Sequence, residues 1–522
     1  MFLFYVDLYN CNFIKTELSR FVIVKSRKLS TQYGIKLFSS VLGSLFGILN
    51  SAIVPKALGV INYGAFSFTT NFFLKFWELF EFRTSYAFFT KVAQRPKEFS
   101  LISFYLFYAA LISVMMIVFT AVAAIPVIRE AVFPNIPFRI VIYALFYAIS
   151  TRILDLFSKI LDARGDTVFL EVQRLINRAI TAALIFMLYY LQKLNVDTYF
   201  LLAISLPLFL IFLLFVFLNR KGVRISLLIL NNYELFKQYV KEFWGYSAPL
   251  MPYTLIAFCV PVFDMWWLQK QGGSAQMGYY AFAFMVTYYP FMFTQALQPI
   301  FTREIAKAAK PRDIEKMSSI FNAYVPAMYS VTALFSAFVF VEADSIIMLL
   351  GGKQYEPSLL AFRILAFYPL LSLYSNLNGA VVYANEFTSL FLKLSLFFFP
   401  VGILASTVLI GDDWFNLGAV GLAIKMVVLE FSSVVVVLFI LTRFLKGSFW
   451  KYLLHIILAV IPFVIIAFVS DNFIESIELI KSQPMFFQFL IKGILYVIFV
   501  AGIGFIFPKI VGLHIVKSML KF

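Results

Sequence analysis

The chain has 522 residues, of which 62% are hydrophobic and only 13% are charged. A soluble domain carries about 45–50% apolar and about 25% charged residues, so this chain lacks the polar material to cover a globular surface. A soluble enzyme and a disordered chain are both excluded. The formal net charge of +16 is expected of a membrane protein whose cytoplasmic loops collect Lys and Arg, and it does not by itself indicate a nucleic-acid partner.

Apolar stretches long enough to cross a membrane, for which about 20 residues are needed, recur about 14 times along the chain. They lie at residues 34–55, 63–90, 100–128, 138–161, 167–191, 197–219, 246–268, 276–302, 317–341, 357–384, 387–410, 416–441, 449–469 and 485–507. Lys and Arg concentrate in alternate loops, which places both termini in the cytoplasm. We therefore predict an all-α integral membrane protein with about 14 transmembrane helices.

Two copies of one glycine pattern predict an internal repeat. Gly59 and Gly64 follow the first stretch, Gly273 and Gly278 follow the seventh, and small and aromatic residues come after each pair. Six stretches separate the copies, and an even number preserves orientation, so the repeats are parallel. The predicted parts are a basic cytoplasmic segment (1–33), an N-lobe of six spans (34–220), a linker with a six-span C-lobe (221–447), and two appended spans with a cytoplasmic tail (448–522).

Two motifs carry a resemblance to a known family. The first is Leu58-Gly59-Val60-Ile61-Asn62-Tyr63-Gly64-Ala65-Phe66-Ser67-Phe68; the second combines Leu349-Leu350-Gly351-Gly352-Lys353-Gln354-Tyr355 with Arg363-Ile364-Leu365-Ala366 and Asn376-Leu377-Asn378-Gly379-Ala380. Over about residues 30–440 the chain resembles the Wzx-type polysaccharide flippases of the multidrug/oligosaccharidyl-lipid/polysaccharide exporter superfamily. The extension before Ser30 and the high Phe content depart from the usual pattern of that family.

The resemblance implies a transporter of the cytoplasmic (inner) membrane. Its cargo would be an oligosaccharide repeat unit linked to polyprenyl pyrophosphate, destined for a surface polysaccharide such as the O-antigen of lipopolysaccharide. The resemblance also implies a cation-lined cleft that opens inward. A polysaccharide polymerase and chain-length machinery are the implied protein partners.

Several charged residues fall inside the predicted spans, where each costs at least about 2.5–3.5 kcal/mol and needs a partner or a wet cavity. One interpretation is structural, because Lys75–Glu78, Arg152–Asp155 and Glu171–Arg174 have the spacing of neutralising pairs on one helix face. Arg178 and Lys425 have no opposite charge one turn away.

The other interpretation is a cationic cavity for pyrophosphate, since Arg binds phosphate through a bidentate fork and Lys through a point charge. The candidate cargo-binding residues are Lys75, Arg152, Arg174 and Arg178, with Arg363 and Lys425 in the second half. The candidates for coupling to H⁺ or Na⁺ are Glu78, Asp155 and Asp264.

The three prolines Pro249, Pro252 and Pro261 in the seventh stretch free backbone carbonyls and bend a helix. Lipid tolerates freed carbonyls only where they face protein or a cavity, so a gating helix is predicted here.

Absent motifs limit the chemistry. The chain has no GxxxxGK[ST] phosphate loop, so an ion gradient or cargo flux, rather than ATP, would drive transport. Isolated histidines and cysteines predict neither a metal site nor a cofactor. We expect a transporter rather than an enzyme, and a monomer, because two lobes suffice to enclose a path.

Two alternatives remain open. A multidrug or cation antiporter of the same fold should carry acidic cavity residues, whereas the buried charges of the first half are mostly basic. A membrane polysaccharide polymerase or glycosyltransferase needs a large outside loop, and the predicted outside loops are all short.

Overall fold

The computed structural model describes residues 29–223, 233–248, 251–295 and 298–506. Most of the predicted basic segment 1–33, part of the linker and the tail beyond residue 506 lie outside these ranges. Within them, the regular secondary structure is helical, which confirms the predicted fold class.

The described helices follow one another along the chain with mostly short connections. They are α3 (Leu29–Glu81), α4 (Thr84–Gln94), α5 (Phe99–Val122), α6 (Pro126–Val132), α7 (Phe138–Ala163), α8 (Thr167–Tyr190), α9 (Val196–Arg220), α10 (Tyr233–Ser247), α11 (Met251–Thr287), α12 (Phe291–Gln295), α13 (Gln298–Ala309), α14 (Ile314–Val341), α15 (Ala343–Leu350), the 3₁₀-helix η3 (Lys353–Ser358), α16 (Leu359–Leu365), α17 (Tyr368–Ala384), α18 (Thr388–Ile410), α19 (Gly418–Phe444), α20 (Phe449–Leu458), α21 (Ile461–Glu475), α22 (Glu478–Lys481) and α23 (Met485–Ile506).

Eleven helical segments of the described chain are long and apolar enough to cross a membrane, so this is a multi-pass membrane protein. Two of them, Leu45–Glu81 and Met251–Thr287, are 37 residues long, and each joins two of the predicted spans. The predicted fifth span corresponds to α8, which is not among the eleven. The count of about 14 spans stays a prediction.

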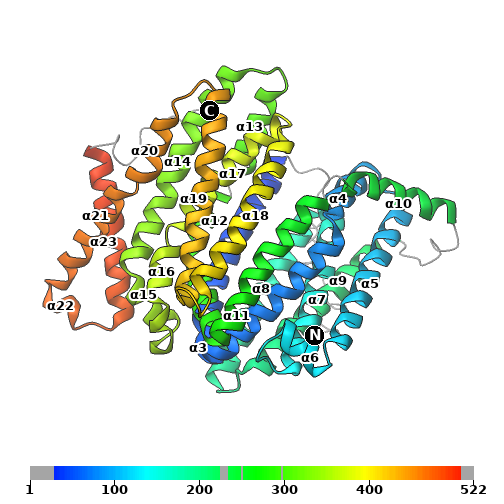
Figure 1. Ribbon diagram of the computed structural model, residues 1–522, viewed down its shortest axis with the longest axis horizontal. Helices are drawn as coiled ribbons and strands as arrows, with labels where there is room; N and C mark the ends of the chain where they lie inside the picture. The colour runs from blue at the N-terminus through cyan, green and yellow to red at the C-terminus, as the bar shows by residue number, and fades with distance from the viewer. Residues whose placement is uncertain (1–28, 224–232, 249–250, 296–297, 507–522) are drawn as a thin grey trace, which may run out of the picture.

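The two long helices bend at the repeated glycines. Gly59 (φ 77°, ψ 163°) interrupts α3, and Gly273 (φ 66°, ψ −175°) interrupts α11. Positive φ is a conformation that glycine adopts without the steric cost of a Cβ atom. Each glycine therefore joins two helical segments across a sharp bend, and both bends lie toward the bottom of Figure 1.

The second glycine of each pair lies where α3 and α11 cross. A Cβ atom at Gly64 would lie 1.8 Å from the carbonyl oxygen of Ser274, and one at Gly278 would lie 2.3 Å from that of Val60. Only glycine lets two backbones approach this closely. The glycines of the predicted repeat therefore occupy matching positions, one pair at the bends and one at the crossing.

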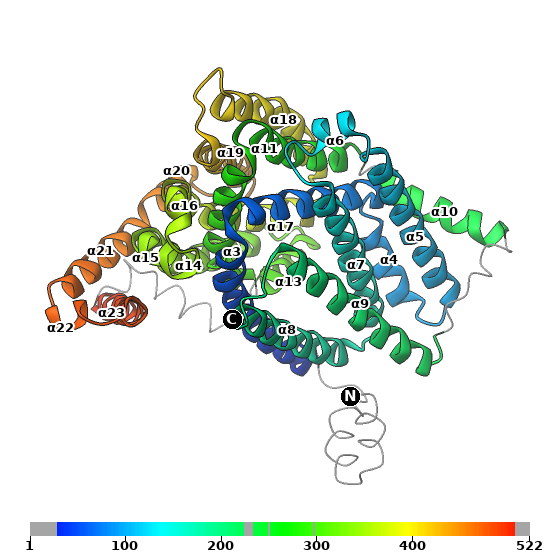
Figure 2. The ribbon, with the colours of Figure 1, turned by 90° about the horizontal axis from the view of Figure 1, so that it is seen from below.

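The helices form two groups that meet at this crossing. In Figure 1, α4 to α10 lie on the right and α12 to α23 on the left, and the groups diverge toward the top of the view. Figure 2, seen from below, shows α20 to α23 as an arm at one edge of the molecule. The bottom end is closed by side-chain contacts as well: buried Tyr355 donates a hydrogen bond from its hydroxyl to the carbonyl oxygen of Pro55 (3.2 Å).

Candidate functional site

The predicted cations of α3 and α7 converge on one carboxylate. Lys75 Nζ lies 2.8 Å from Glu78 Oε2, and Arg152 Nη2 lies 2.7 Å from Glu78 Oε1. Arg152 also donates to the carbonyl oxygen of Leu74 at 3.0 Å. Glu78 therefore holds two of the predicted cargo-binding cations and joins α3 to α7.

A second charged group lies on α8. Arg174 Nη1 lies 2.9 Å from Glu171 Oε1, as the spacing predicts, and the other oxygen of Glu171 accepts a hydrogen bond from Ser39 of α3. Asp155 of α7 interacts electrostatically with Arg152, Lys159 and Arg174, and so links the two charged groups.

Arg178 is placed differently. An ideal Cβ on Gly43 of α3 would lie 1.6 Å from Nη1 of Arg178, so the guanidinium rests directly on this glycine. Among the described residues, neither Arg178 nor Lys159 has a carboxylate within 4.0 Å. These two cations retain capacity for an external anion.

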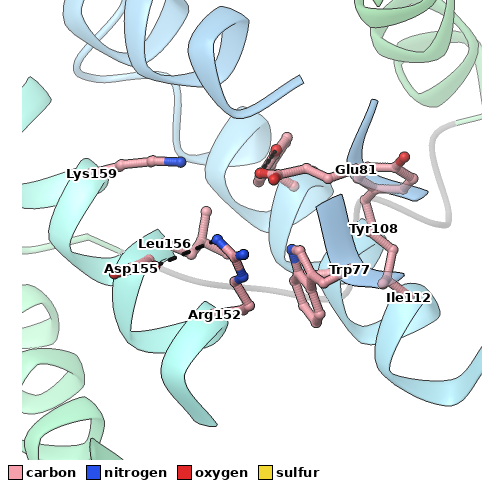
Figure 3. Close-up of a pocket in the computed structure, with 10 residues that line it drawn as sticks. Trp77, Glu81, Tyr108, Ile112, Arg152, Asp155, Leu156 and Lys159 are labelled. Carbon is pink, nitrogen blue, oxygen red and sulfur yellow. Dashed lines mark hydrogen bonds and ion pairs between the residues drawn. The ribbon is translucent and has the colours of Figure 1, made fainter. Parts of the chain in front are cut away.

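A small polar cavity opens between α3, α5 and α7 (Figure 3). Arg152, Asp155 and Lys159 reach it from α7, and Trp77 and Glu81 reach it from α3. Glu81 accepts a hydrogen bond from the Tyr105 hydroxyl at 3.1 Å. The cavity is small: its volume is about 20 Å³, room for about one water molecule.

Together, the charged side chains of this first half make up the cationic cluster. It has five cations and four carboxylates, a formal excess of one positive charge; its members are Lys75, Arg152, Lys159, Arg174 and Arg178 with Glu78, Glu81, Asp155 and Glu171.

In the second half, two predicted site residues neutralise each other. Lys425 of α19 forms an ion pair with Asp264 of α11, and their side chains are 2% and 6% exposed. Ser406 of α18 donates a hydrogen bond to the other oxygen of Asp264 (2.5 Å). The three residues tie three helices together, and the opposite charge that Lys425 lacks on its own helix comes from another one.

Arg363 lies apart from the cationic cluster. Its Nη2 is 2.6 Å from Asp344 Oδ2 of α15, and both side chains are exposed. The structure thus brings Lys75, Glu78, Arg152 and Asp155 together, with Arg174 and Arg178 beside them, and leaves Arg363 outside.

Glu430 is a residue that sequence reasoning did not select. It lies on α19 and interacts with Ser375, Tyr288 and Tyr368. No Lys or Arg of the described chain lies within 4.0 Å of it. Its signal in the sequence is a single carboxylate in a long apolar stretch.

Comparisons with known proteins agree on the fold. No family model matches the chain, and no curated protein matches it by sequence. Among solved structures it is similar to "Lipid II flippase MurJ, inward closed conformation" (TM-score 0.62, 12% identity, 92% of this chain and 100% of that chain covered). An inward-facing multidrug resistance MATE family transporter of the MOP superfamily matches with a TM-score of 0.58, 15% identity, and coverage of 82% of this chain and 98% of that one. The MATE transporter VcmN of Vibrio cholerae matches with a TM-score of 0.51, 14% identity, and coverage of 81% and 98%.

The chain has the same fold as these transporter structures. Sequence identities this low show a shared architecture and nothing more. The resemblance to Wzx-type flippases stays a prediction. The roles of the nine predicted site residues also stay predictions. A conclusion about the cargo of this protein therefore has to come from the charges of the chain itself.

Proposed function

We propose that the protein flips an oligosaccharide linked to a lipid pyrophosphate across the cytoplasmic membrane, for the synthesis of a surface polysaccharide. The fold supports a transporter, since the similar structures include a lipid flippase and multidrug transporters. The termini would lie in the cytoplasm, and a polysaccharide polymerase would receive the translocated unit. A polyprenyl-pyrophosphate sugar carries two negative charges, so its path needs cations.

The observation that carries the proposal is the cationic cluster. Its carboxylates Glu78, Asp155 and Glu171 are already engaged by Lys or Arg. Arg178 and Lys159 have no carboxylate within 4.0 Å among the described residues and interact with Glu171 and Asp155, respectively, at longer range. A guanidinium without a close carboxylate favours a phosphate, to which it offers two parallel hydrogen bonds. The cluster therefore suits an anionic headgroup better than a cationic drug.

Transport in proteoliposomes tests the proposal. Lipid-pyrophosphate oligosaccharide is supplied on one side, and its appearance on the other side is read with an impermeant glycosidase. We expect translocation by the wild type and its loss in Arg178→Ala, because the pyrophosphate then loses its unpaired guanidinium. Arg139→Ala is the matched control, since Arg139 lies on α7 in an exposed pair with Asp197, outside the cluster. A glycolipid that stays on one side in the wild type contradicts the proposal.

Glu430 favours a second candidate, a cation or multidrug antiporter. A carboxylate without a cationic partner among the described residues, placed beside Tyr288 and Tyr368, is a site at which an organic cation can bind. In this case a cationic dye would move in the proteoliposomes and Glu430→Gln would stop it, while Arg178→Ala would leave dye transport intact.

A further inference from the structure

The backbone between α3 and α4 is strained. Phe82 (φ 47°) and Arg83 (φ 59°) are consecutive non-glycine residues in the left-handed region. Hydrogen bonds to α5 hold both sides of this turn: the Tyr108 hydroxyl donates to the carbonyl oxygen of Phe80, and the hydroxyls of Thr84 and Tyr105 lie 2.8 Å apart. Strain of this kind persists only where the surroundings impose it, and it recurs at switch regions.

The strained turn directs Arg83 toward the other helix group. Its guanidinium carbon lies 4.6 Å from the ring centroid of Tyr253, near the beginning of α11. Tyr383, near the end of α17, interacts electrostatically with Tyr253, Arg83 and Tyr86. Of the two crossing helices, α3 packs mainly on α5, α7 and α8 of the first group, and α11 on α16, α18 and α19 of the second. These four residues, the Arg83 clasp, therefore connect α3 and α4 on one side to α11 and α17 on the other.

The clasp lies at the end of the molecule where the groups diverge, opposite the bends of α3 and α11 (Figure 1). Here the described residues connect through the cation–π contact of Arg83 and its neighbouring tyrosines, whereas the bottom end has a backbone crossing at Gly64 and Gly278. Arg83 has no carboxylate within 4.0 Å among the described residues. Its charge is balanced only by the weak negative potential of an aromatic face.

We propose that Arg83 is an anion-operated clasp. The diphosphate of the cargo binds the guanidinium of Arg83 in place of the Tyr253 ring, and the second helix group is thereby released. This inference rests on the proposed function for the identity of the anion. A phosphate offers the guanidinium two charge-assisted hydrogen bonds, which are stronger than stacking on a phenol ring. The clasp then opens when cargo arrives and closes when it has left.

Cross-linking across the clasp tests this inference without a transport assay. Tyr86→Cys and Tyr383→Cys place thiols on two exposed positions, one in each group, in a background with Cys259→Ala and Cys11→Ala. A short bifunctional maleimide then reports how often the two positions meet. We expect Arg83→Gln and Tyr253→Leu to lower the cross-linking yield severalfold, and Tyr253→Phe, which keeps the ring, to retain it. An unchanged yield in Arg83→Gln overturns the clasp.

Farnesyl diphosphate is the probe for the anion, with farnesol as its uncharged control. We expect the diphosphate, and not farnesol, to lower the yield in the otherwise wild-type pair and to have no further effect in Arg83→Gln. Equal effects of diphosphate and farnesol, or no effect of either, overturn the anion-operated part. If the diphosphate opens the clasp but no glycolipid is translocated in proteoliposomes, the clasp is supported and the proposed function fails.

Discussion

Arg178 rests on the backbone of Gly43, with no carboxylate of the described chain within 4.0 Å. This contact fixes the position of the guanidinium without neutralising it. A Cβ atom at this position would occupy the place of Nη1, so a larger residue would displace the guanidinium. The pair Gly43–Arg178 therefore offers a way to move a charge without deleting it.

Gly43→Ala should displace the Arg178 guanidinium while the helices stay in place, because the new Cβ atom meets the far end of a flexible side chain, which can move. A hydrogen bond to a charged group contributes about 1.5–3 kcal/mol, so its loss weakens cargo binding by about 10- to 100-fold. We expect a raised KM with little change in kcat, measured from initial rates against glycolipid concentration. Gly502→Ala, in open space on α23, is the control. An unaltered KM would mean that Arg178 does not touch the cargo.

Lys425→Met should destabilise the second half, because it leaves Asp264 buried beside only Ser406. Removing one member of a buried ion pair costs about 3–5 kcal/mol, whereas replacing both members is often neutral. Thermal unfolding in detergent should show a clearly lowered Tm for Lys425→Met and recovery of most of the loss in Lys425→Met/Asp264→Asn. Equal stability of the single and double variants would show that the pair is not the cause.

Spacing along the sequence predicted the pairs that lie on one helix and could not predict those between helices. Lys75–Glu78 and Glu171–Arg174 form as the one-turn spacing indicates. Asp264 and Lys425 are 161 residues apart, and only the packing of α11 on α19 brings them together. For the same reason, the second contact of Glu78, to Arg152, is invisible in the sequence.

Among the helices, α10 shows how a connecting element is fastened. It lies between the two groups in the chain, and Glu242 on it binds both Lys91, at the end of α4, and Arg95 (2.8 Å). Burial raises the pKa of Glu242, but the hydrogen bonds and charges of Lys91 and Arg95 outweigh burial and hold the pKa below its usual value. Ionised Glu242 therefore contributes stability to the attachment of α10.

A depressed pKa contributes stability that is fully present above the unfolded value of about 4.3 and is lost as pH falls through the lower folded value. Hydrogen exchange of residues 233–247 should therefore be unchanged between neutral pH and about pH 5, and protection, corrected for intrinsic rates, should fall below about pH 4. Glu242→Gln should already be less protected at neutral pH. Glu234→Gln, at the exposed beginning of α10, should behave as wild type. Equal protection in both variants would contradict the role of Glu242.

The helices themselves were predictable because long apolar stretches leave few alternatives in lipid. The connections between the helices were less predictable. The chain turns at Gly59 and Gly273 without a polar loop, which the sequence does not distinguish from a short loop. The predicted tenth span is divided into the end of η3, α16 and α17, although Ala366 and Phe367, between α16 and α17, keep right-handed helical dihedrals.

Over the whole molecule, the two ends differ in how firmly the helix groups are joined. At the bottom, α3 and α11 cross in backbone contact, Tyr355 binds the carbonyl of Pro55, and Gln354 donates to the carbonyl of Lys56 (3.1 Å). At the top, the Arg83 clasp is the corresponding connection. The parallel repeat predicted two related halves, but the difference between their ends depends on packing that the sequence does not show.

A transporter that alternates its access must separate the firm end at some stage, so holding that end closed should stop transport. Lys56→Cys with Gln354→Cys, joined by a short bifunctional maleimide in the Cys259→Ala and Cys11→Ala background, spans the two groups where the side chain of one meets the backbone of the other. We expect the cross-linked protein to retain its fold and to lose glycolipid translocation. Arg139→Cys with Asp197→Cys is the matched control, because α7 and α9 belong to one group and need not separate. Full transport with the Lys56–Gln354 positions joined would show that the path opens elsewhere, and loss of transport in both pairs would indicate a general effect of cross-linking.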